Sequence, residues 1–164
     1  MARALVVEWP DDPTTWPIAD QWLLGDALLV APILDSTHRR RVYLPAGTWT
    51  DWRSGARIAG PRWIEVEAAL DVLPLWVREG HVVALGPSLE WVGERPTDTV
   101  ELHIAPFTAD GETSALVAVD EERVQVRYAA RDGAHRVAIG PSRARFETVA
   151  LGAGAPSIEL PPKI

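Results

Sequence analysis

The chain contains no cysteine, and this absence excludes disulfide bonds, thiolate nucleophiles and cysteine-ligated metal sites. Long apolar runs are also missing, since none approaches the roughly 20 residues that an apolar helix needs to cross a bilayer. The residues before Glu8 do not have the pattern of a secretory signal peptide. These observations predict a cytoplasmic protein with no membrane partner.

Positive charge is scarce. The 16 Lys and Arg residues are outnumbered by 23 Asp and Glu residues, so the formal net charge at pH 7 is −7. Proteins that bind nucleic acid usually cluster basic side chains, because these neutralise phosphates. The one short basic run, His38 to Arg41, leads directly into the strand-like residues Val42 to Leu44. We interpret this run as a solvated entrance to a strand rather than a phosphate site, and we expect no nucleic-acid partner.

The pattern of apolar residues predicts an all-β protein, because short apolar or alternating segments are separated by turn residues. Ala4 to Trp9 is an apolar run interrupted only by Glu8, and it predicts a strand buried on both faces. Ile18 to Leu24 predicts a short helix that ends at Gly25. Pro45 to Gly47 predicts a turn, and polar and apolar residues alternate over Trp63 to Glu67 as in a half-buried strand.

The composition of the chain changes near residue 90. All 8 tryptophans precede residue 92, and the later segments are plain aliphatic alternations separated by turns such as Asp132-Gly133, a tight-hairpin signal. We therefore expect two small antiparallel β-sandwich domains, a proximal one over residues 35–90 and a distal one over residues 91–164. The distal strands are expected at residues 99–105, 115–119, 123–130, 135–139, 145–151 and 157–160.

Candidate groups for chemistry are few. Cleavage of a glycoside normally needs two carboxyl groups on opposite sides of the scissile bond. The acidic runs at Asp11-Asp12 and 120–122 have an obvious role in turns, so catalysis by Asp11, Asp12 or Glu122 is a weak hypothesis. The histidines are far apart and lack the spacing of a metal site (His38, His81, His103 and His135). We assign no catalytic, cofactor-binding or metal-binding residue.

The tryptophans carry the one binding signal, because an indole face can stack on a sugar ring. Four of them are candidates for a sugar-stacking platform: Trp49, Trp52, Trp63 and Trp76. Packing in a core or an interface is the favoured interpretation, since bulky side chains fill a small sandwich efficiently. Trp9, Trp16 and Trp22 have a third interpretation, which is packing against a neighbouring domain.

Several phrases occur in a specific order along the chain. They are EWPDDP at residues 8–13, DQWLLGDALLVAP at 20–32, VYLPAGTW at 42–49 and LPLWVREG at 73–80. The first two resemble the end of the catalytic barrel in glycoside hydrolase family 31, and the others resemble the β-domain that follows it. Details at residues 60–63 and 83–86 are most similar to bacterial α-xylosidases, with α-glucosidases as the alternative. The similarity is clear over residues 1–107.

The resemblance implies that residues 1–34 are a remnant of the last (β/α)8-barrel repeat with a short helix, followed by the two sandwiches. It also implies a retaining α-glycosidase whose aspartate nucleophile and aspartate acid/base lie on upstream barrel strands. The Trp-x-Asp-Met pattern of the family's nucleophile does not occur in this sequence, nor does the acid/base segment. No catalytic residue is therefore transferred to this chain.

Three functions follow as hypotheses. The first is a C-terminal accessory region that supports the barrel of a retaining α-xylosidase or α-glucosidase, with the barrel upstream or on a separate partner chain, and inactive alone. The second is a stand-alone carbohydrate-binding sandwich that binds an oligosaccharide through the tryptophans. The third is an intact enzyme. Because a barrel strand without neighbours exposes unpaired backbone, we expect residues 1–34 to be loosely held or sheltered on the sandwich or in a dimer.

Overall fold

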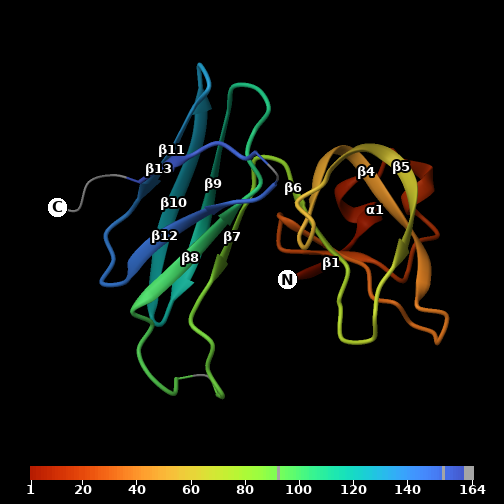
Figure 1. The fold of residues 1–164 in the computed structure, drawn as a ribbon, viewed down its shortest axis with the longest axis horizontal. Helices are drawn as coiled ribbons and strands as arrows, with labels where there is room; N and C mark the ends of the chain where they lie inside the picture. Colours follow the sequence, from red (N-terminus) through yellow and green to blue (C-terminus); the bar gives the residue numbers. More distant parts are fainter. Residues whose placement is uncertain (92, 153, 161–164) are drawn as a thin grey trace. The chain divides into compact units, whose positions relative to one another are not determined.

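The computed structural model describes residues 1–91, 93–152 and 154–160, and it confirms an all-β chain. The chain divides into two compact units, Met1–Glu79 (unit 1) and Gly80–Ile164 (unit 2), which Figure 1 shows in red to yellow-green and in green to blue. No described helix is long and apolar enough to cross a membrane. Each unit has a hydrophobic core of its own.

Unit 1 is built on one six-stranded sheet with the order β1-β2-β3-β6-β4-β5, in which all neighbours are antiparallel. A short helix α1 (Leu5–Glu8) and a 3-10 turn η1 (Pro13–Thr15) follow the first strand. The strands are β1 (Ala2–Ala4), β2 (Trp22–Leu24), β3 (Leu28–Val30), β4 (Arg39–Asp51), β5 (Arg57–Glu67) and β6 (Leu75–Arg78).

The core of unit 1 contains residues from segments spread between Leu5 and Trp76. Leu5 of α1, Leu23 of β2 and Leu29 of β3 are fully buried with Trp49 of β4, and Trp76 of β6 is almost so. Full burial of each large apolar side chain contributes roughly 1.5–3 kcal/mol. Of the alternatives expected for residues 1–34, the structure has the segment sheltered on the sheet, as part of the same core.

The expected strand over Ala4–Trp9 is wrong. The chain is extended only in β1 and then forms the single turn of α1, in which the Trp9 amide donates to the Leu5 carbonyl at 2.9 Å. Leu5 is the buried residue of this turn, whereas Val7 is 64% exposed. A short apolar run cannot by itself distinguish a strand from a helical turn, because both bury apolar side chains.

The expected helix over Ile18–Leu24 is also wrong, since residues 22–24 form β2. The decisive contact is tertiary. The buried Gln21 side chain donates to the Tyr43 carbonyl (2.6 Å) and accepts from the Tyr43 amide (3.0 Å). An amide side chain can pair with an exposed strand backbone in this way because it carries both a donor and an acceptor. The contact holds the chain extended where local propensity favours a helix.

Pro45 to Gly47 does not end a strand, contrary to the expected turn. These residues lie inside β4, and the register with β5 shifts between Leu44 and Gly47 as at a β-bulge. Gly60 of β5 faces the bulge, where an added Cβ would lie 2.0 Å from the Pro45 carbonyl oxygen. Glycine is required there because the two backbones approach each other closely.

Unit 2 is a β-sandwich of a four-stranded sheet (β13-β11-β10-β9) and a three-stranded sheet (β12-β8-β7) (Figure 1). The β8–β12 and β11–β13 pairs are parallel, and the other pairs are antiparallel. The strands are β7 (Val82–Leu85), β8 (Thr99–Ile104), β9 (Gly111–Val119), β10 (Glu122–Arg131), β11 (Ala134–Ile139), β12 (Arg145–Ala150) and β13 (Ile158–Glu159). Six of these lie where the sequence predicted distal strands.

The core of unit 2 comes from strand alternation. On β10, Val124, Val126 and Tyr128 are buried while the residues between them are exposed. The predicted Asp132-Gly133 hairpin turn is confirmed, because it joins β10 to β11 and both residues have positive φ (49° and 75°). Two positive φ values are what the tight hairpin turn requires.

The division between Glu79 and Gly80 differs from the expected boundaries near residues 34 and 90. β2 and β3 from the first expected segment belong to the same sheet as β4, β5 and β6. β7, which the sequence placed in the proximal sandwich, pairs with β8 of unit 2. Strand pairing between distant residues therefore sets the units.

Candidate functional site

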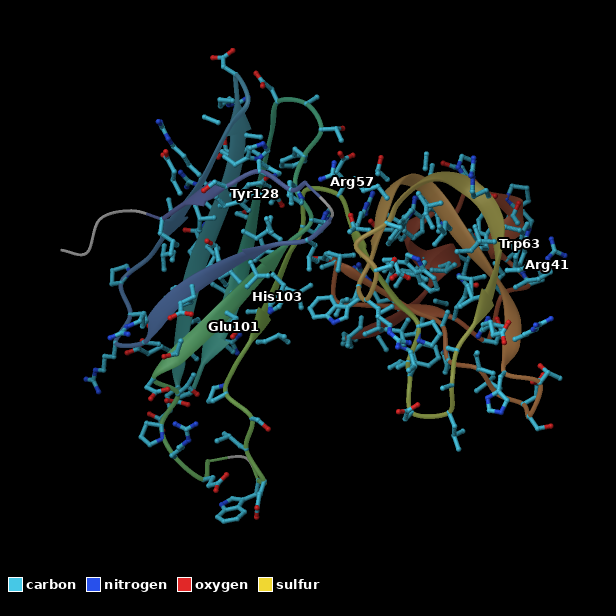
Figure 2. All side chains as sticks on the ribbon, viewed as in Figure 1. Arg41, Arg57, Trp63, Glu101, His103 and Tyr128 are labelled. Carbon is cyan, nitrogen blue, oxygen red and sulfur yellow. The ribbon has the colours of Figure 1, made fainter. Side chains whose placement is uncertain are left out.

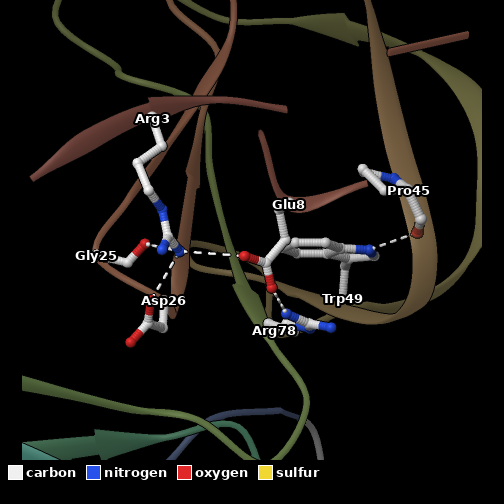
Figure 3. Close-up of polar contacts among 7 residues, drawn as sticks. All are labelled: Arg3, Glu8, Gly25, Asp26, Pro45, Trp49 and Arg78. Carbon is white, nitrogen blue, oxygen red and sulfur yellow. Dashed lines mark hydrogen bonds and ion pairs between the residues drawn. The ribbon is translucent and has the colours of Figure 1, made fainter. Parts of the chain in front are cut away.

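An ion-paired cluster joins the start of unit 1 to its last strand (Figure 3). Glu8 at the end of α1 lies between two arginines: its Oε1 accepts from Arg78 Nη1 at 2.9 Å, and its Oε2 lies 3.4 Å from Arg3 Nη2. Arg3 also donates to Asp26 Oδ1 (2.7 Å) and to the Gly25 carbonyl (3.2 Å). The cluster therefore connects β1, α1, the turn before β3, and β6.

Aromatic rings extend this cluster into the core. The Arg78 guanidinium lies over the Trp9 ring, 5.2 Å from its centroid, and the Trp9 and Trp49 ring centroids are 5.9 Å apart. The Trp49 indole N–H donates to the Pro45 carbonyl at 2.9 Å (Figure 3), which satisfies the polar atom of a fully buried ring. The arrangement is a structural anchor, because each group has a partner within unit 1.

The same segment carries exposed apolar side chains. We define the N-terminal apolar surface as Val7, Trp16, Leu24 and Leu34, which are 64%, 63%, 48% and 74% exposed. Large exposed apolar groups that lie together in the fold are typical of a surface that another structure covers. The polar end of Trp16 is satisfied internally, since its indole N–H donates to the Pro10 carbonyl at 2.9 Å.

Asp12 holds the turn between these features. Its Oδ1 accepts from the Thr14 amide at the start of η1 (3.0 Å), and its Oδ2 accepts from the Tyr43 hydroxyl (2.5 Å). The Tyr43 hydrogen bond, helped by Thr14, lowers the pKa of Asp12 below its usual value, although burial acts in the opposite direction. Burial and then Asp12 raise the pKa of Tyr43. Both shifts favour an ionised Asp12 beside a neutral Tyr43, so Asp12 acts as a turn anchor.

The weak catalytic candidates are divided between the two units. Asp11 and Asp12 belong to unit 1, whereas Glu122 begins β10 of unit 2. Glu122 Oε2 accepts from the Ser142 hydroxyl (3.0 Å) and the Arg143 amide (3.3 Å), which holds a loop. A glycosidase places its two carboxyl groups about 5–10 Å apart across the substrate. Asp12 and Glu122 have structural partners within their own units instead.

The histidines lie apart along the fold. His103 Nε2 of β8 is 2.9 Å from Glu101 Oε2, and both side chains are labelled in Figure 2. His135 Nδ1 of β11 is 2.6 Å from the Tyr128 hydroxyl. Tyr128 also accepts from the Phe107 amide at 3.2 Å. Among residues 1–91, 93–152 and 154–160, no three His, Asp or Glu side chains are grouped so that they could hold a metal ion.

The four tryptophans proposed as a sugar platform have different surroundings. Trp49 and Trp76 are 0% and 1% exposed, so neither presents a ring face to solvent and a four-ring platform does not form. Their burial agrees with the favoured interpretation, core packing. Trp63 is 41% exposed on β5, and Trp52 is half-buried after β4, so these two keep the sugar-stacking hypothesis as a prediction.

Comparison with known proteins gives the family. The C-terminal domain of glycosyl hydrolase family 31 matches residues 1–83. The chain belongs to glycoside hydrolase family 31. Alpha-glucosidase 2 of Bacillus thermoamyloliquefaciens is 33% identical over 77% of the chain, and an alpha-xylosidase of Saccharolobus solfataricus is 29% identical over 77%. The resemblance to glycoside hydrolase family 31 is confirmed.

A solved structure extends the likeness to almost the whole chain. The family 31 α-xylosidase of Xanthomonas citri superposes with a TM-score of 0.72 over 95% of this chain, at 26% identity. The chain spans 16% and 17% of the two curated relatives named above and 19% of the Xanthomonas citri chain. The family 31 match thus places this chain in the C-terminal part of such enzymes.

Sequence reasoning missed the ion-paired cluster, although its members lie in the phrases that carry the family resemblance. Glu8 opens EWPDDP, and Arg78 lies in LPLWVREG. The available signal for Glu8 was its position as a charged residue directly after the apolar residues 4–7. Its partners Arg3 and Arg78 are 5 and 70 residues away, and only the fold brings all three together.

Proposed function

We propose that this chain is the accessory β-region of a retaining α-glycosidase that acts on α-glucosides or α-xylosides, and that it docks onto the enzyme's catalytic barrel. The observation that carries the proposal is the family 31 C-terminal-domain match over residues 1–83, which includes the N-terminal apolar surface. The curated relatives include an α-glucosidase and an α-xylosidase, which sets the substrate class of the proposal.

The docking role follows from how the N-terminal apolar surface is supported. Val7 lies on α1 and Leu24 at the end of β2, while Leu5 and Leu23 next to them are buried in the core. The apolar surface is therefore held on a rigid base rather than on a free segment. The Arg3–Glu8–Arg78 cluster fixes α1 to β6, which keeps Val7 in place. A preorganised apolar patch loses little entropy when it is covered.

Asp12 and Glu122 have the structural partners described above, and the family's nucleophile pattern does not occur in the sequence. We therefore expect the isolated chain to be inactive. The stand-alone sugar-binding module is less favoured, because two of its four proposed tryptophans lie in the core.

The proposal is tested by mixing the chain with a tagged barrel segment of a family 31 α-glucosidase or α-xylosidase. We expect co-elution on size exclusion, and turnover of an aryl α-glucoside or aryl α-xyloside by the mixture. Trp16→Glu and Leu24→Asp place charges in the apolar surface and should abolish co-elution. Trp91→Glu, in unit 2 and also exposed, is the matched control. Turnover by the isolated chain, or equal loss of co-elution with all three variants, contradicts the proposal.

A further inference from the structure

The exposed face of the β4–β5 ribbon contains a hollow of about 440 Å³. Its lining residues are Arg39, Arg40 and Arg41 of β4 and Glu65, Val66 and Glu67 of β5. Because alternate strand residues share a face, Arg39 and Arg41 lie on one face together with their register partners Glu67 and Glu65. A volume of this size falls within the range of roughly 300–1,000 Å³ for small-molecule sites.

The two ends of the hollow are held by different contacts. At one end, Arg39 Nη2 and Glu67 Oε2 form an ion pair at 2.9 Å. At the other end, the Arg41 guanidinium lies over the Trp63 ring at 4.9 Å, and Figure 2 shows these two side chains together at the edge of unit 1. The Tyr43 and Trp63 ring centroids are 5.2 Å apart, so Trp63 is supported from a second direction. These contacts restrict the side chains that border the hollow.

The charges around the hollow are balanced. Arg39 and Arg41 supply donors, while Glu65 and Glu67 supply acceptors from the facing strand. Arg40 is directed elsewhere, since it pairs with Asp20 at 2.9 Å and its side chain is 9% exposed. A multiply charged anion would meet the two glutamates, and a cation would meet the two arginines. The hydroxyl groups of a neutral sugar both donate and accept, so they match alternating arginines and glutamates.

The dimensions suit a sugar ring. Arg39 and Arg41 are two residues apart on an extended strand, which separates them by about 6.6 Å along β4. Trp63 at the Arg41 end is 41% exposed and offers apolar indole surface to the C–H groups of a sugar. The guanidinium of Arg41, which lies over this ring, carries several N–H donors in one plane and can make paired hydrogen bonds to neighbouring hydroxyls.

We propose that this hollow is a binding site for a short neutral oligosaccharide. The choice of an α-linked glucose or xylose oligosaccharide depends on the proposed function, whereas the neutral polyhydroxy character of the ligand follows from the lining. Arg41, Glu65 and Trp63 are the binding residues.

The test is a titration of the 15N-labelled chain with maltotriose, isomaltotriose and xylobiose, followed by two-dimensional NMR. We expect saturable shifts of the Trp63 indole signal and of the amides of Arg41 and Glu65 with at least one sugar. Arg41→Met and Glu65→Ala should each weaken binding about tenfold, because each removes charge-assisted hydrogen bonds. Trp63→Ala should weaken binding by a similar factor, because stacking surface is lost.

Matched controls identify the site. Arg53→Met lies in the turn after β4, outside the hollow, and Trp91→Ala removes an exposed tryptophan of unit 2; both should bind as the parent chain does. Dispersed spectra of each variant confirm folding. The absence of saturable shifts with all three sugars overturns the proposal, as does equal weakening by Arg53→Met. Tighter binding of citrate than of any sugar would also overturn it, since the hollow would then be an anion site.

The result is independent of the docking test. The sugar titration uses the isolated chain and needs no barrel, and the co-elution test needs no sugar. Sugar binding without co-elution supports the hollow and contradicts docking, whereas co-elution without sugar binding does the reverse.

Discussion

Units 1 and 2 each contain a small β-sheet core, but they fill it with different residues and strand patterns. Unit 2 buries alternate aliphatic residues on regular strands, as on β10, and its core cluster consists mainly of valines. Unit 1 combines four short strands with two long ones, and it fills its core with Trp49, Trp76 and leucines from five separate segments. Regular alternation makes unit 2 readable from local sequence, whereas unit 1 depends on contacts between distant segments.

The polar contacts of the two units also differ, because those of unit 1 join distant segments. In unit 1, Gln21, Asp12 and Glu8 each hold segments 22 to 70 residues away. Several unit 2 ion pairs are highly exposed, such as Arg136–Glu159 with side chains 74% and 68% exposed. Exposed pairs contribute little to stability, because water and salt screen them. The exposed apolar residues of the N-terminal surface also belong to unit 1, which is the unit proposed to dock.

The largest expected effect is the loss of the aromatic centre of unit 1. Trp49→Ala removes a fully buried ring that touches Trp9 and donates to Pro45, and it should cost about 3–5 kcal/mol of unfolding free energy. Urea denaturation followed by NMR should show unit 1 unfolding first while the valine signals of unit 2 stay dispersed. Trp91→Ala, at an exposed position, is the control and should change stability by less than about 0.5 kcal/mol. Simultaneous unfolding of both units would contradict their independence.

A matched change in unit 2 should be smaller. Tyr128→Phe keeps the buried ring but removes the hydroxyl that contacts His135 Nδ1 and the Phe107 amide. Leaving buried polar partners unsatisfied should cost about 1–3 kcal/mol. The measurement is the urea midpoint of unit 2 signals, and the unit 1 midpoint should not move. An unchanged unit 2 midpoint would show that this hydroxyl contributes nothing to the sandwich.

The next prediction compares the Arg78–Glu8 ion pair of unit 1 with the exposed Arg136–Glu159 pair of unit 2. Arg78→Met removes the pair with Glu8 and the contact with the Trp9 ring, and it should lower unit 1 stability by about 1–2 kcal/mol. Arg78→Lys should recover part of this loss, because the charge returns without the planar group. Arg136→Met in unit 2 is the matched control, with an expected change below about 0.5 kcal/mol. Equal effects of Arg78→Met and Arg136→Met would remove the distinction between the units.

The smallest effect concerns acid stability. The pKa of Asp12 is lowered chiefly by Tyr43, and that of Asp120 in unit 2 is lowered chiefly by Thr97. A carboxyl group with a lowered folded-state pKa adds stability above its unfolded value of 3.8, and this is lost as pH falls through the folded value. Tyr43→Phe and Thr97→Val should therefore each lower the melting temperature of their own unit at pH 6. The Asp12 and Asp120 parts of these differences should shrink below pH 3.8, and pH-independent differences would refute their origin in the carboxylates.

The fold of unit 2 could be predicted from sequence because each strand carries its own signal. Alternation on β10 and the Asp132-Gly133 turn are local features, and both appear in the structure as predicted. In unit 1, local signals were misleading at Ala4–Trp9 and Ile18–Leu24, where the deciding contacts are burial of Leu5 and the pairing of Gln21 with Tyr43. In the sequence, only Trp63 pointed to the hollow. Its charged lining residues come together only through the register of β5 with β4.

The order of residues alone determined the all-β character of the chain, its family phrases, and the lack of the family's catalytic motif, because these depend on composition and short patterns. Tertiary structure decided that residues 1–34 belong to the sheet of unit 1, that Trp49 and Trp76 are core residues, and that Glu8 lies between Arg3 and Arg78. The physical reason is that burial and ion pairing depend on which distant segments meet, and no local pattern encodes that meeting.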